Sequence, residues 1–284
     1  MVIKNESNNS RYSVLMSVYD KETPDNLRTA MDSIWNQTVE PDDFVLVCDG
    51  PLTPELDEVV DEMKERHSGI LQVVRLKENG GLGNALNAGM KCCKNELIAR
   101  MDSDDISRPD RCELQMEVFS KNPELSIVSG VVEEFSESTD RTEIRRVLPE
   151  KQEEIVKFAQ KRNPFNHPCV MYRKSAVEAV DGYKSIFLLE DYYLWVKMIQ
   201  NGSIGYNIQR PLLWMRAGSD LYKRRSGMEY VRSQKELFKY MKNYGFISTW
   251  QYMRSVTLRG ISSLMPNKVR DFVYKKVLRK ARKE

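Results

Sequence analysis

The chain has 284 residues, 41% of them hydrophobic and 30% charged, which is enough for one large domain or a domain with a small appendage, and too apolar for wholesale disorder. A net charge of +3 gives no general basis for nucleic-acid binding, and the five cysteines show no CxxC or Cys/His ligand spacing. We therefore expect a reduced, cytosolic protein with no nucleic-acid partner and no zinc site, and predict neither a signal peptide nor a membrane-spanning apolar run.

Short apolar runs alternate with helical patterns in the first half of the chain. We predict strands at 12–18, 43–49, 71–76 and 96–102, separated by helices at 23–37, 53–66 and 81–93. The first two helices begin with Thr-Pro, a pairing that places a capping hydroxyl before a proline in the first turn. Strands that alternate with helices in this way predict right-handed crossovers and a mainly parallel α/β sheet covered on both faces.

The pattern loosens after Ser107. Here we predict a helix at 108–122, a strand at 125–135, a helix at 149–162, a strand entered through two prolines at 163–173, and a helix at 188–202. A further strand includes 212–216, and from about Ser226 the chain turns helical and basic.

Four predicted strands end in polar or glycine-rich residues: Tyr19-Asp20, Asp49-Gly50, Asn79-Gly80-Gly81, and Asp102 to Asp105. In sheets of this kind ligands bind at the carboxyl ends of the strands. One such end would mean little, but four on a shared edge predict a site.

Three carboxylates, Asp102, Asp104 and Asp105, follow the fourth predicted strand. Alone, such a group is more typical of a solvated turn, because Asp is a turn former. At a shared strand edge it favours a divalent cation held by one or two carboxylates, with water and ligand phosphates completing the shell. Period-two geometry would point Asp102 and Asp104 the same way and Asp105 the other.

The other candidate groups each have a bland interpretation beside the functional one. Asp49 either contacts a ribose or base or simply ends a strand, and the glycines around Gly81 fit no dinucleotide motif but permit close backbone approach to a ligand. Glu190 and Asp191 either interact favourably with the dipole at the N-terminus of a helix or supply a general base. His167 lines the site or makes a structural hydrogen bond, and we place His67 at the surface.

The ordered set of motifs resembles glycosyltransferase family 2, with wording close to the bacterial exopolysaccharide and capsule branch of amylovoran-type enzymes. The matching motifs are SVYDKE (17–22), QT (37–38), VCDGP (47–51), KENGGLGNALNAG (77–89), ARMDSDDI (99–106), NPFNHP (163–168) and EDYYLW (190–195). The match spans roughly residues 12 to 216.

The resemblance implies a type-A glycosyltransferase fold and a metal-dependent, inverting transfer from a nucleotide-sugar, expected to be a UDP-sugar, with Mn²⁺ or Mg²⁺ as cofactor. It assigns nucleotide contacts to Val18, Tyr19, Asp20, Asp49, Gly81, Arg100 and Asp102, metal contacts to Asp104 and Asp102, and the catalytic base to Asp191. Sugar or acceptor contacts are expected from Asp105, His167, Glu190 and Trp195.

The chain departs from many relatives after the strand that ends near Arg216, where Arg216-Ala217-Gly218 replaces a histidine. Arg216 or Arg224 is expected to stabilise the diphosphate instead. We expect a catalytic domain at 1–220 and a helical, basic extension at 221–284. Its last part, 264–284, holds eight Lys or Arg against two acids. It is expected to lie on an anionic membrane surface, and the alternative is a solvated helix that packs on its own domain.

The resemblance implies as acceptor a growing, polyprenyl-linked glycan in bacterial polysaccharide synthesis, and a peripheral position on the inner face of the cell membrane. Two alternatives stay open from the residues. A sugar nucleotidyltransferase would carry a glycine-rich basic loop after the first strand, which SVYDKETPD lacks. A non-catalytic sugar- or nucleotide-binding module would have no need of the Glu190-Asp191 pair.

Overall fold

The computed structural model describes residues 11–136, 138–140, 142–217 and 227–264, and these fall into two compact units. The first unit lies within Met1–Ser185 and Glu190–Arg216, and the second within Ile186–Leu189 and Ala217–Glu284. No helix among these described residues is both long and apolar enough to cross a membrane.

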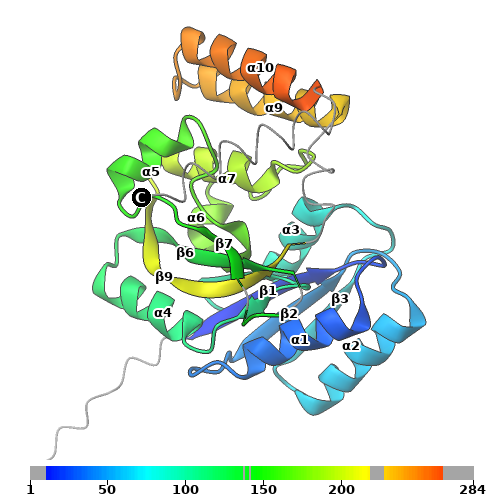
Figure 1. The fold of residues 1–284 in the computed structure, drawn as a ribbon. Helices are drawn as coiled ribbons and strands as arrows, with labels where there is room; N and C mark the ends of the chain where they lie inside the picture. Colours follow the sequence, from blue (N-terminus) through cyan, green and yellow to red (C-terminus); the bar gives the residue numbers. More distant parts are fainter. Residues whose placement is uncertain (1–10, 137, 141, 218–226, 265–284) are drawn as a thin grey trace, which may run out of the picture. The chain divides into compact units, whose positions relative to one another are not determined.

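The first unit is built on one mixed sheet whose first four strands are parallel, as predicted (Figure 1). These strands, β1 (Tyr12–Val18), β2 (Asp43–Cys48), β3 (Leu71–Arg75) and β4 (Leu97–Asp102), take the order β3-β2-β1-β4. Between them run α1 (Pro24–Trp35), α2 (Pro54–Arg66) and α3 (Leu82–Cys92). All four strands therefore end at the same edge of the sheet.

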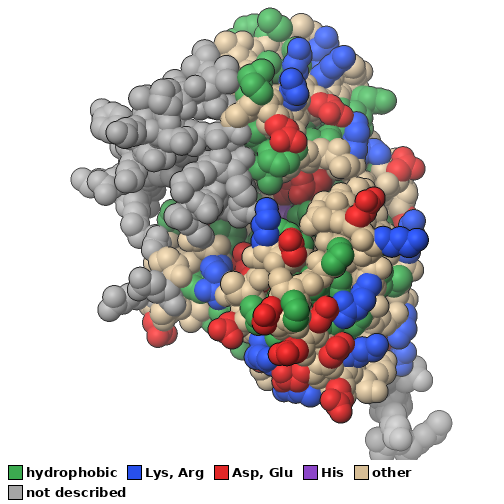
Figure 2. Space-filling model, turned by 90° about the vertical axis from the view of Figure 1, so that its right-hand side faces the viewer, with side chains coloured by type: hydrophobic (Ala, Val, Ile, Leu, Met, Phe, Trp, Pro, Cys, Tyr) green, Lys and Arg blue, Asp and Glu red, His purple; other side chains and the backbone are tan. Residues whose placement is uncertain are grey.

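The local signals read from the sequence specify the starts of α1 and α2. Thr23 Oγ1 accepts a hydrogen bond from Asn26 N at 3.2 Å, and Thr53 Oγ1 accepts one from Leu56 N at 3.3 Å. Each hydroxyl satisfies a backbone N–H that the helix itself leaves without a partner. On the outer surface, α2 presents acids that pair with Arg28, Arg66 and Arg75, and acidic and basic side chains are interspersed over the lower part of this face in Figure 2.

Close approach of α3 to the sheet depends on Gly89. A Cβ at this position would lie 2.5 Å from both Leu15 Cδ1 and Val47 Cγ2. Leu15 and Val47 are fully buried, so neither can turn into solvent to make room. The helix is held against β1 and β2, and its first turn is thereby placed beside the carboxyl ends of those strands.

The second half of the sheet mixes strand directions. β8 (Met171–Arg173) runs antiparallel to β4 and to β6 (Leu125–Phe135), while β9 (Ile204–Arg216) runs parallel to β6. The connecting helices are α4 (Arg111–Lys121), α5 (Gln152–Ala159) and α7 (Glu190–Gln200), with the short 3-10 turn η1 (His167–Cys169) before β8. The predicted strand 125–135 and the helix in 188–202 are confirmed.

Three short elements were not predicted. They are β5 (Ile106–Ser107), β7 (Thr142–Arg146) and α6 (Lys174–Glu178). β5 pairs with β9, which is remote in sequence, and β7 pairs antiparallel with β6, the strand that precedes it in the chain. The predicted helix 108–122 begins only at Arg111, because Arg108 to Asp110 form the turn that leaves β5.

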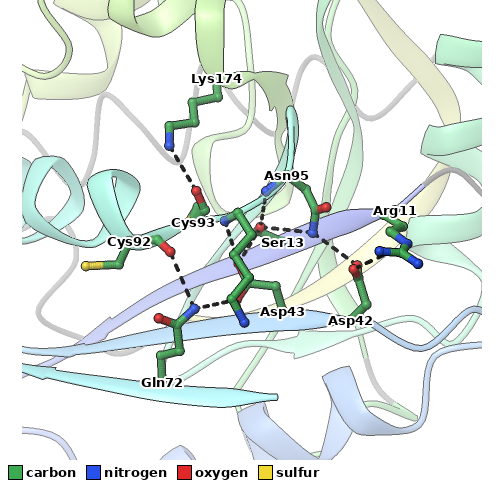
Figure 3. Close-up of polar contacts among 10 residues, drawn as sticks. Arg11, Ser13, Asp42, Asp43, Gln72, Cys92, Cys93, Asn95 and Lys174 are labelled. Atoms are coloured by element: carbon green, nitrogen blue, oxygen red, sulfur yellow. Dashed lines mark hydrogen bonds and ion pairs between the residues drawn. The ribbon is translucent and has the colours of Figure 1, made fainter. Parts of the chain in front are cut away.

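A buried polar cluster ties the strands together at the edge opposite the four strand ends (Figure 3). Asp43 is fully buried; its Oδ2 accepts from Ser13 Oγ at 2.6 Å and from Lys94 N at 2.8 Å, and its Oδ1 accepts from Gln72 Nε2. Asn95 N donates in turn to Ser13 Oγ at 3.1 Å. The carboxylate thus joins β1, β2 and β3 to the turn before β4, and all of its bonds go to the protein's own groups.

In the second unit, α9 (Met228–Asn243) and α10 (Thr249–Leu264) form a helical hairpin with strong local end signals. At the end of α9, Gly245 has φ +71, Gly245 N donates to Lys242 O and Phe246 N donates to Met241 O, which is a Schellman motif. At the start of α10, Ser248 and Gln251 form a reciprocal capping box, with distances of 2.7 and 3.2 Å. Both helix boundaries are therefore well specified.

Candidate active site

The four polar strand ends are neighbours at one edge, as the parallel pairings require. Asp102 at the end of β4 stands opposite Ser17 of β1, and Val18 of β1 stands opposite Cys48 of β2. Asp49 N then donates to Val18 O at 2.8 Å. Val18 is buried, whereas Tyr19 is half-buried and Asp20 is exposed at the rim of this edge.

Asp49 fixes the conformation of the glycine-rich turn at Asn79-Gly80-Gly81. Its Oδ1 accepts from Gly80 N at 2.8 Å and its Oδ2 accepts from Gly81 N at 3.0 Å. The turn also lies against Gly50, where a Cβ would stand 2.8 Å from Asn79 N. The clamp fixes the residues that lead into α3, whose first position follows Gly81 with φ +83 and no side-chain cap.

The three carboxylates after β4 converge on one point. The strand ends at Asp102, and Ser103-Asp104 make a turn, so that oxygens of Asp102, Asp104 and Asp105 all lie within 4.8 Å of one another. The expected separation of Asp105 from the other two by strand alternation is therefore wrong. Alternation holds only while the chain remains extended.

Arg100 supplies a positive charge beneath this group. Its side chain is 1% exposed, and its Nη1 donates to Asp102 Oδ2 at 3.0 Å while its Nη2 contacts Asp102 Oδ1. A guanidinium so deeply buried, and paired with Asp102, presents almost no surface in the structure, and its expected contact with a nucleotide stays a prediction. Arg100 orients Asp102, whose side chain is 32% exposed.

Among the residues that the structure describes, no cationic side chain forms an ion pair with Asp104 or Asp105. Burial, and then the charges of Asp102 and Glu22, raise the pKa of Asp104 to about 7. Burial, and then the charges of Asp104 and Asp102, raise the pKa of Asp105 well above its usual range. Asp105 Oδ1 accepts from Arg216 N at 2.9 Å, whereas its buried Oδ2 has no hydrogen-bond partner.

Crowded carboxylates with an unsatisfied buried oxygen are what a hard divalent cation would stabilise. Mn²⁺ or Mg²⁺ prefers oxygen ligands, and this set offers three acids in reach of one point. The residues present therefore fit the expected metal, which Asp104 and Asp102 would hold, with Asp105 as a further candidate.

Arg216, at the end of β9, contacts the turn from Asp102 to Asp105, here called the acidic turn. In addition to the backbone bond to Asp105, its Nε donates to Asp104 O at 3.1 Å, and its guanidinium carbon lies 4.7 Å from the ring centre of Phe135. The residue expected at the diphosphate is thus beside the carboxylates. The other expected diphosphate residue, Arg224, and the basic segment 265–284 lie outside the described residues.

Glu190 and Asp191 open α7. Asp191 Oδ2 accepts from Asn163 Nδ2 at 2.5 Å, and a Cβ on Gly83 of α3 would lie 3.6 Å from Glu190 Cβ. Burial, followed by the charge of Asp191, raises the pKa of Glu190 to about 7, and Asp102 contributes in the same direction. The start of α7 therefore belongs to the same electrostatic environment as the acidic turn.

Two residues expected to contact sugar, Trp195 and His167, are buried. Trp195 is fully buried among the side chains that fill the core, with its ring edge-on to Phe165 at 5.8 Å, so it has no surface for a sugar. His167 is buried and its Nε2 lies 3.0 Å from Tyr183 Oη. Burial, then the charge of Arg100, lowers the pKa of His167 well below its usual range, so we describe it as a neutral structural histidine.

Residues without an assigned role in the sequence also shape the site. Glu22 accepts from Ser103 Oγ at 3.1 Å and so links the loop after β1 to the acidic turn, and Asn163 holds Asp191. Gln37, which is buried, donates to Ser107 Oγ and Arg108 O and accepts from Cys112 N. Glu22, Gln37 and Asn163 lie in the motifs SVYDKE, QT and NPFNHP that carry the family resemblance, so their position in these motifs is the sequence signal that could have identified them.

Comparison with known proteins agrees with this architecture. The model of "Glycosyl transferase family 2" matches residues 13–181. An Escherichia coli protein described as UDP-Gal:alpha-D-GlcNAc-diphosphoundecaprenol beta-1,3-galactosyltransferase is 37% identical over 270 residues, 95% of this chain and 97% of that protein. The Erwinia amylovora amylovoran biosynthesis glycosyltransferase AmsE is 38% identical over 270 residues, 93% of this chain and 98% of AmsE.

Solved structures show the same fold at low identity. The S. aureus TarS fragment 1–349 in complex with UDP-GlcNAc has a TM-score of 0.68 at 15% identity, covering 91% of this chain and 77% of that one. The mannosyltransferase PcManGT from Pyrobaculum calidifontis, in complex with GDP-Man and Mn²⁺, has a TM-score of 0.60 at 13% identity, covering 94% and 79%.

Proposed function

The chain belongs to glycosyltransferase family 2, and from this premise we propose that it transfers a hexose from a UDP-sugar, with inversion, to a hydroxyl of a lipid-linked glycan in bacterial polysaccharide synthesis. The observation that carries the proposal is the meeting of Asp102, Asp104 and Asp105 at the strand edge where Asp49 holds the glycine turn.

The proposed donor site lies over the ends of β1 and β2. The Escherichia coli relative is named for a UDP-Gal donor, and the TarS fragment was solved with UDP-GlcNAc. In this chain, the backbone at Val18 and Tyr19, the side chain of Asp20, and the Asp49–Gly81 clamp would form the walls of a base and ribose site. Backbone N–H groups and glycines allow a ligand to approach closely there.

The proposed diphosphate site is the acidic turn, where Asp104 and Asp102 would hold Mn²⁺ or Mg²⁺. The bound cation would neutralise negative charge that develops on the departing diphosphate. The chain's own contribution is to fix the ligands: Arg100 orients Asp102, and Arg216 ties down Asp105 and the backbone of Asp104. The Arg216 guanidinium is also the proposed positive charge beside the diphosphate.

The proposed base is Asp191. A carboxylate that accepts the proton of an acceptor hydroxyl as it attacks the anomeric carbon makes a weak nucleophile competent. Asn163 donates to one oxygen of Asp191 and so orients the carboxylate. One displacement from the face opposite the leaving group inverts the anomeric configuration, so that no enzyme nucleophile is needed.

The proposed acceptor is polyprenyl-linked, as the name of the Escherichia coli relative states for that protein. Such an acceptor would place the enzyme at the cytoplasmic face of the cell membrane. We further propose that residues 1–220 carry the transfer reaction and that 221–284 serve the approach to the acceptor.

The test is to screen the purified chain against UDP-, GDP- and dTDP-sugars with Mn²⁺ and a short polyprenyl diphosphate-linked N-acetylhexosamine, and to compare wild type with Asp191→Asn. We expect transfer from a UDP-sugar, lost by at least 10²-fold in Asp191→Asn while UDP binding persists. The matched control is Asp181→Asn, because the Asp181 side chain is 96% exposed. Unchanged turnover in Asp191→Asn would remove Asp191 as the base.

A further inference from the structure

The solvent-exposed side of helix α10 is more apolar than the side that packs on α9, which reverses the usual amphipathic arrangement of a surface helix. Over Thr249 to Gly260, the part of α10 whose side chains the structure describes, the exposed residues are Thr249, Trp250, Met253, Arg254, Thr257 and Leu258, and the last five recur at the spacing of one helical face. Trp250 is 68% exposed, Met253 58% and Leu258 56%. The half-buried side consists of Gln251, Tyr252, Ser255, Val256, Arg259 and Gly260.

Imprecise helix boundaries do not explain this arrangement. The capping box at Ser248 and Gln251 sets the start of α10. On the inner side, the Lys242 ammonium of α9 stands 5.5 Å from the Tyr252 ring centre, and the Arg259 guanidinium stands 5.0 Å from that of Phe238. These contacts fix which side of α10 faces α9, and the apolar residues are left on the other. An exposed group of large apolar side chains on one face marks an interaction surface.

The charges of α10 restrict the kind of partner. Over Thr249–Leu264 the sequence contains two arginines and no acidic residue. The guanidinium of Arg254, on the exposed face, lies 5.5 Å from the ring centre of Trp250. A face that combines Trp, Met and Leu with Arg and lacks acids complements an anionic bilayer surface, where apolar side chains enter the interface and arginines meet phosphates.

We propose that the exposed face of α10 docks on anionic phospholipid membranes, with Trp250, Met253 and Leu258 inserted at the headgroup level and Arg254 against lipid phosphates. The choice of a membrane rather than a protein partner rests in part on the proposed function, since a polyprenyl-linked acceptor resides in a bilayer. This surface is distinct from the basic segment 264–284, because it is carried by residues before that segment.

The test is flotation of the full chain with vesicles of phosphatidylglycerol and phosphatidylethanolamine, and with phosphatidylcholine vesicles for comparison. We expect binding to the anionic vesicles, reduced at least tenfold in the triple variant Trp250→Ser/Met253→Ser/Leu258→Ser and about fivefold in Arg254→Gln. The matched controls are Val147→Ser, an exposed apolar residue of the first unit, and Lys64→Gln, an exposed cation on α2; both should bind as wild type.

Several results would overturn the proposal. Wild-type protein that stays unbound, or a triple variant that floats as well as wild type, would remove α10 as the membrane surface. If the substitutions lower the melting temperature of the triple variant as much as core substitutions would, then the chain itself covers this face. A wild-type dimer that becomes a monomer in the triple variant, without vesicle binding in either, would assign the face to a second copy.

Turnover separates this inference from the proposed reaction. The triple variant should transfer sugar to a water-soluble acceptor analogue at the wild-type rate, and more slowly to a polyprenyl-linked acceptor in vesicles. Vesicle binding without any transfer by wild type would refute the proposed function and leave the membrane surface standing. Transfer by wild type without vesicle binding would do the reverse.

Discussion

The acidic turn makes cation binding a proton exchange, and Asp104 is where this exchange can be measured. Burial, with the charges of Asp102 and Glu22, raises the pKa of Asp104 from its ordinary 3.8 to about 7. That difference corresponds to about 4 kcal/mol for holding the carboxylate ionised without a cation. Below pH 7 the metal-free protein therefore holds a proton that a bound cation must displace.

Two consequences follow for pH dependence. The affinity for Mn²⁺ should rise about tenfold per pH unit up to pH 7 and then level off, as far as Asp104 controls it. The folded chain also keeps this proton between about pH 4 and 7 where the unfolded chain releases it. The metal-free protein therefore loses the stability that this group contributes as pH rises through that window, and Mn²⁺ should restore it.

The assay is calorimetric titration of Mn²⁺ in two buffers of different ionisation enthalpy, which counts released protons. At pH 6, wild type should release about one proton more than Asp104→Asn, and at pH 8 the difference should nearly vanish. Asp61→Asn, whose side chain is 75% exposed on α2, should behave as wild type. Equal proton release by wild type and Asp104→Asn at pH 6, or a wild-type affinity independent of pH, would refute the reasoning.

Three further substitutions test the parts around the acidic turn. Asn163→Ala removes the donor to Asp191 and should lower kcat about tenfold while the KM for donor stays unchanged; a change in KM alone would contradict an orienting role. Asp49→Ala removes the acceptor of Gly80 N and leaves Gly81 N with Asn79 Oδ1 alone, and it should weaken UDP binding about tenfold or more in a fluorescence titration. Wild-type affinity in this variant would show that the turn keeps its conformation without Asp49. Gly89→Ala should lower the free energy of unfolding, measured in urea, by about 1 to 3 kcal/mol, because the added Cβ meets Leu15 and Val47. Gly260→Ala in α10, where an added Cβ has nothing within 4 Å, should raise it by up to about 1 kcal/mol. Equal effects of the two substitutions would refute the packing argument.

The sequence predicted the first half of the fold well because its signals are local. Thr23 and Thr53 cap their helices, and each of the four apolar runs forms a parallel strand. β5 escaped prediction because it has only two residues and depends on β9, which is remote in sequence, and β7 escaped because its five residues, TEIRR, form no apolar run of their own. Strands of this kind are stabilised by their partners more than by their own sequence.

The candidate site likewise contains residues that local patterns place correctly and residues whose position depends on the folded chain. Position after a strand was sufficient to bring Asp49, Asp102 and Asp104 to one edge, because parallel strands share their ends. The turn at Ser103 that returns Asp105 to its neighbours could not be read from strand alternation. Trp195 illustrates a different limit, because an aromatic residue on a helix suits both a sugar pocket and a core, and only packing shows that it fills the core.

The hydrogen bond from Arg216 N to Asp105 joins positions that are 111 residues apart. During synthesis the acidic turn is made early, but the strand that anchors Asp105 leaves the ribosome last in the first unit. A nascent chain that stops short of β9 can form the parallel strands and yet lacks the anchor of Asp105. Competence to bind a cation should therefore arrive as a final event in the maturation of this unit, and would report that its sheet is complete.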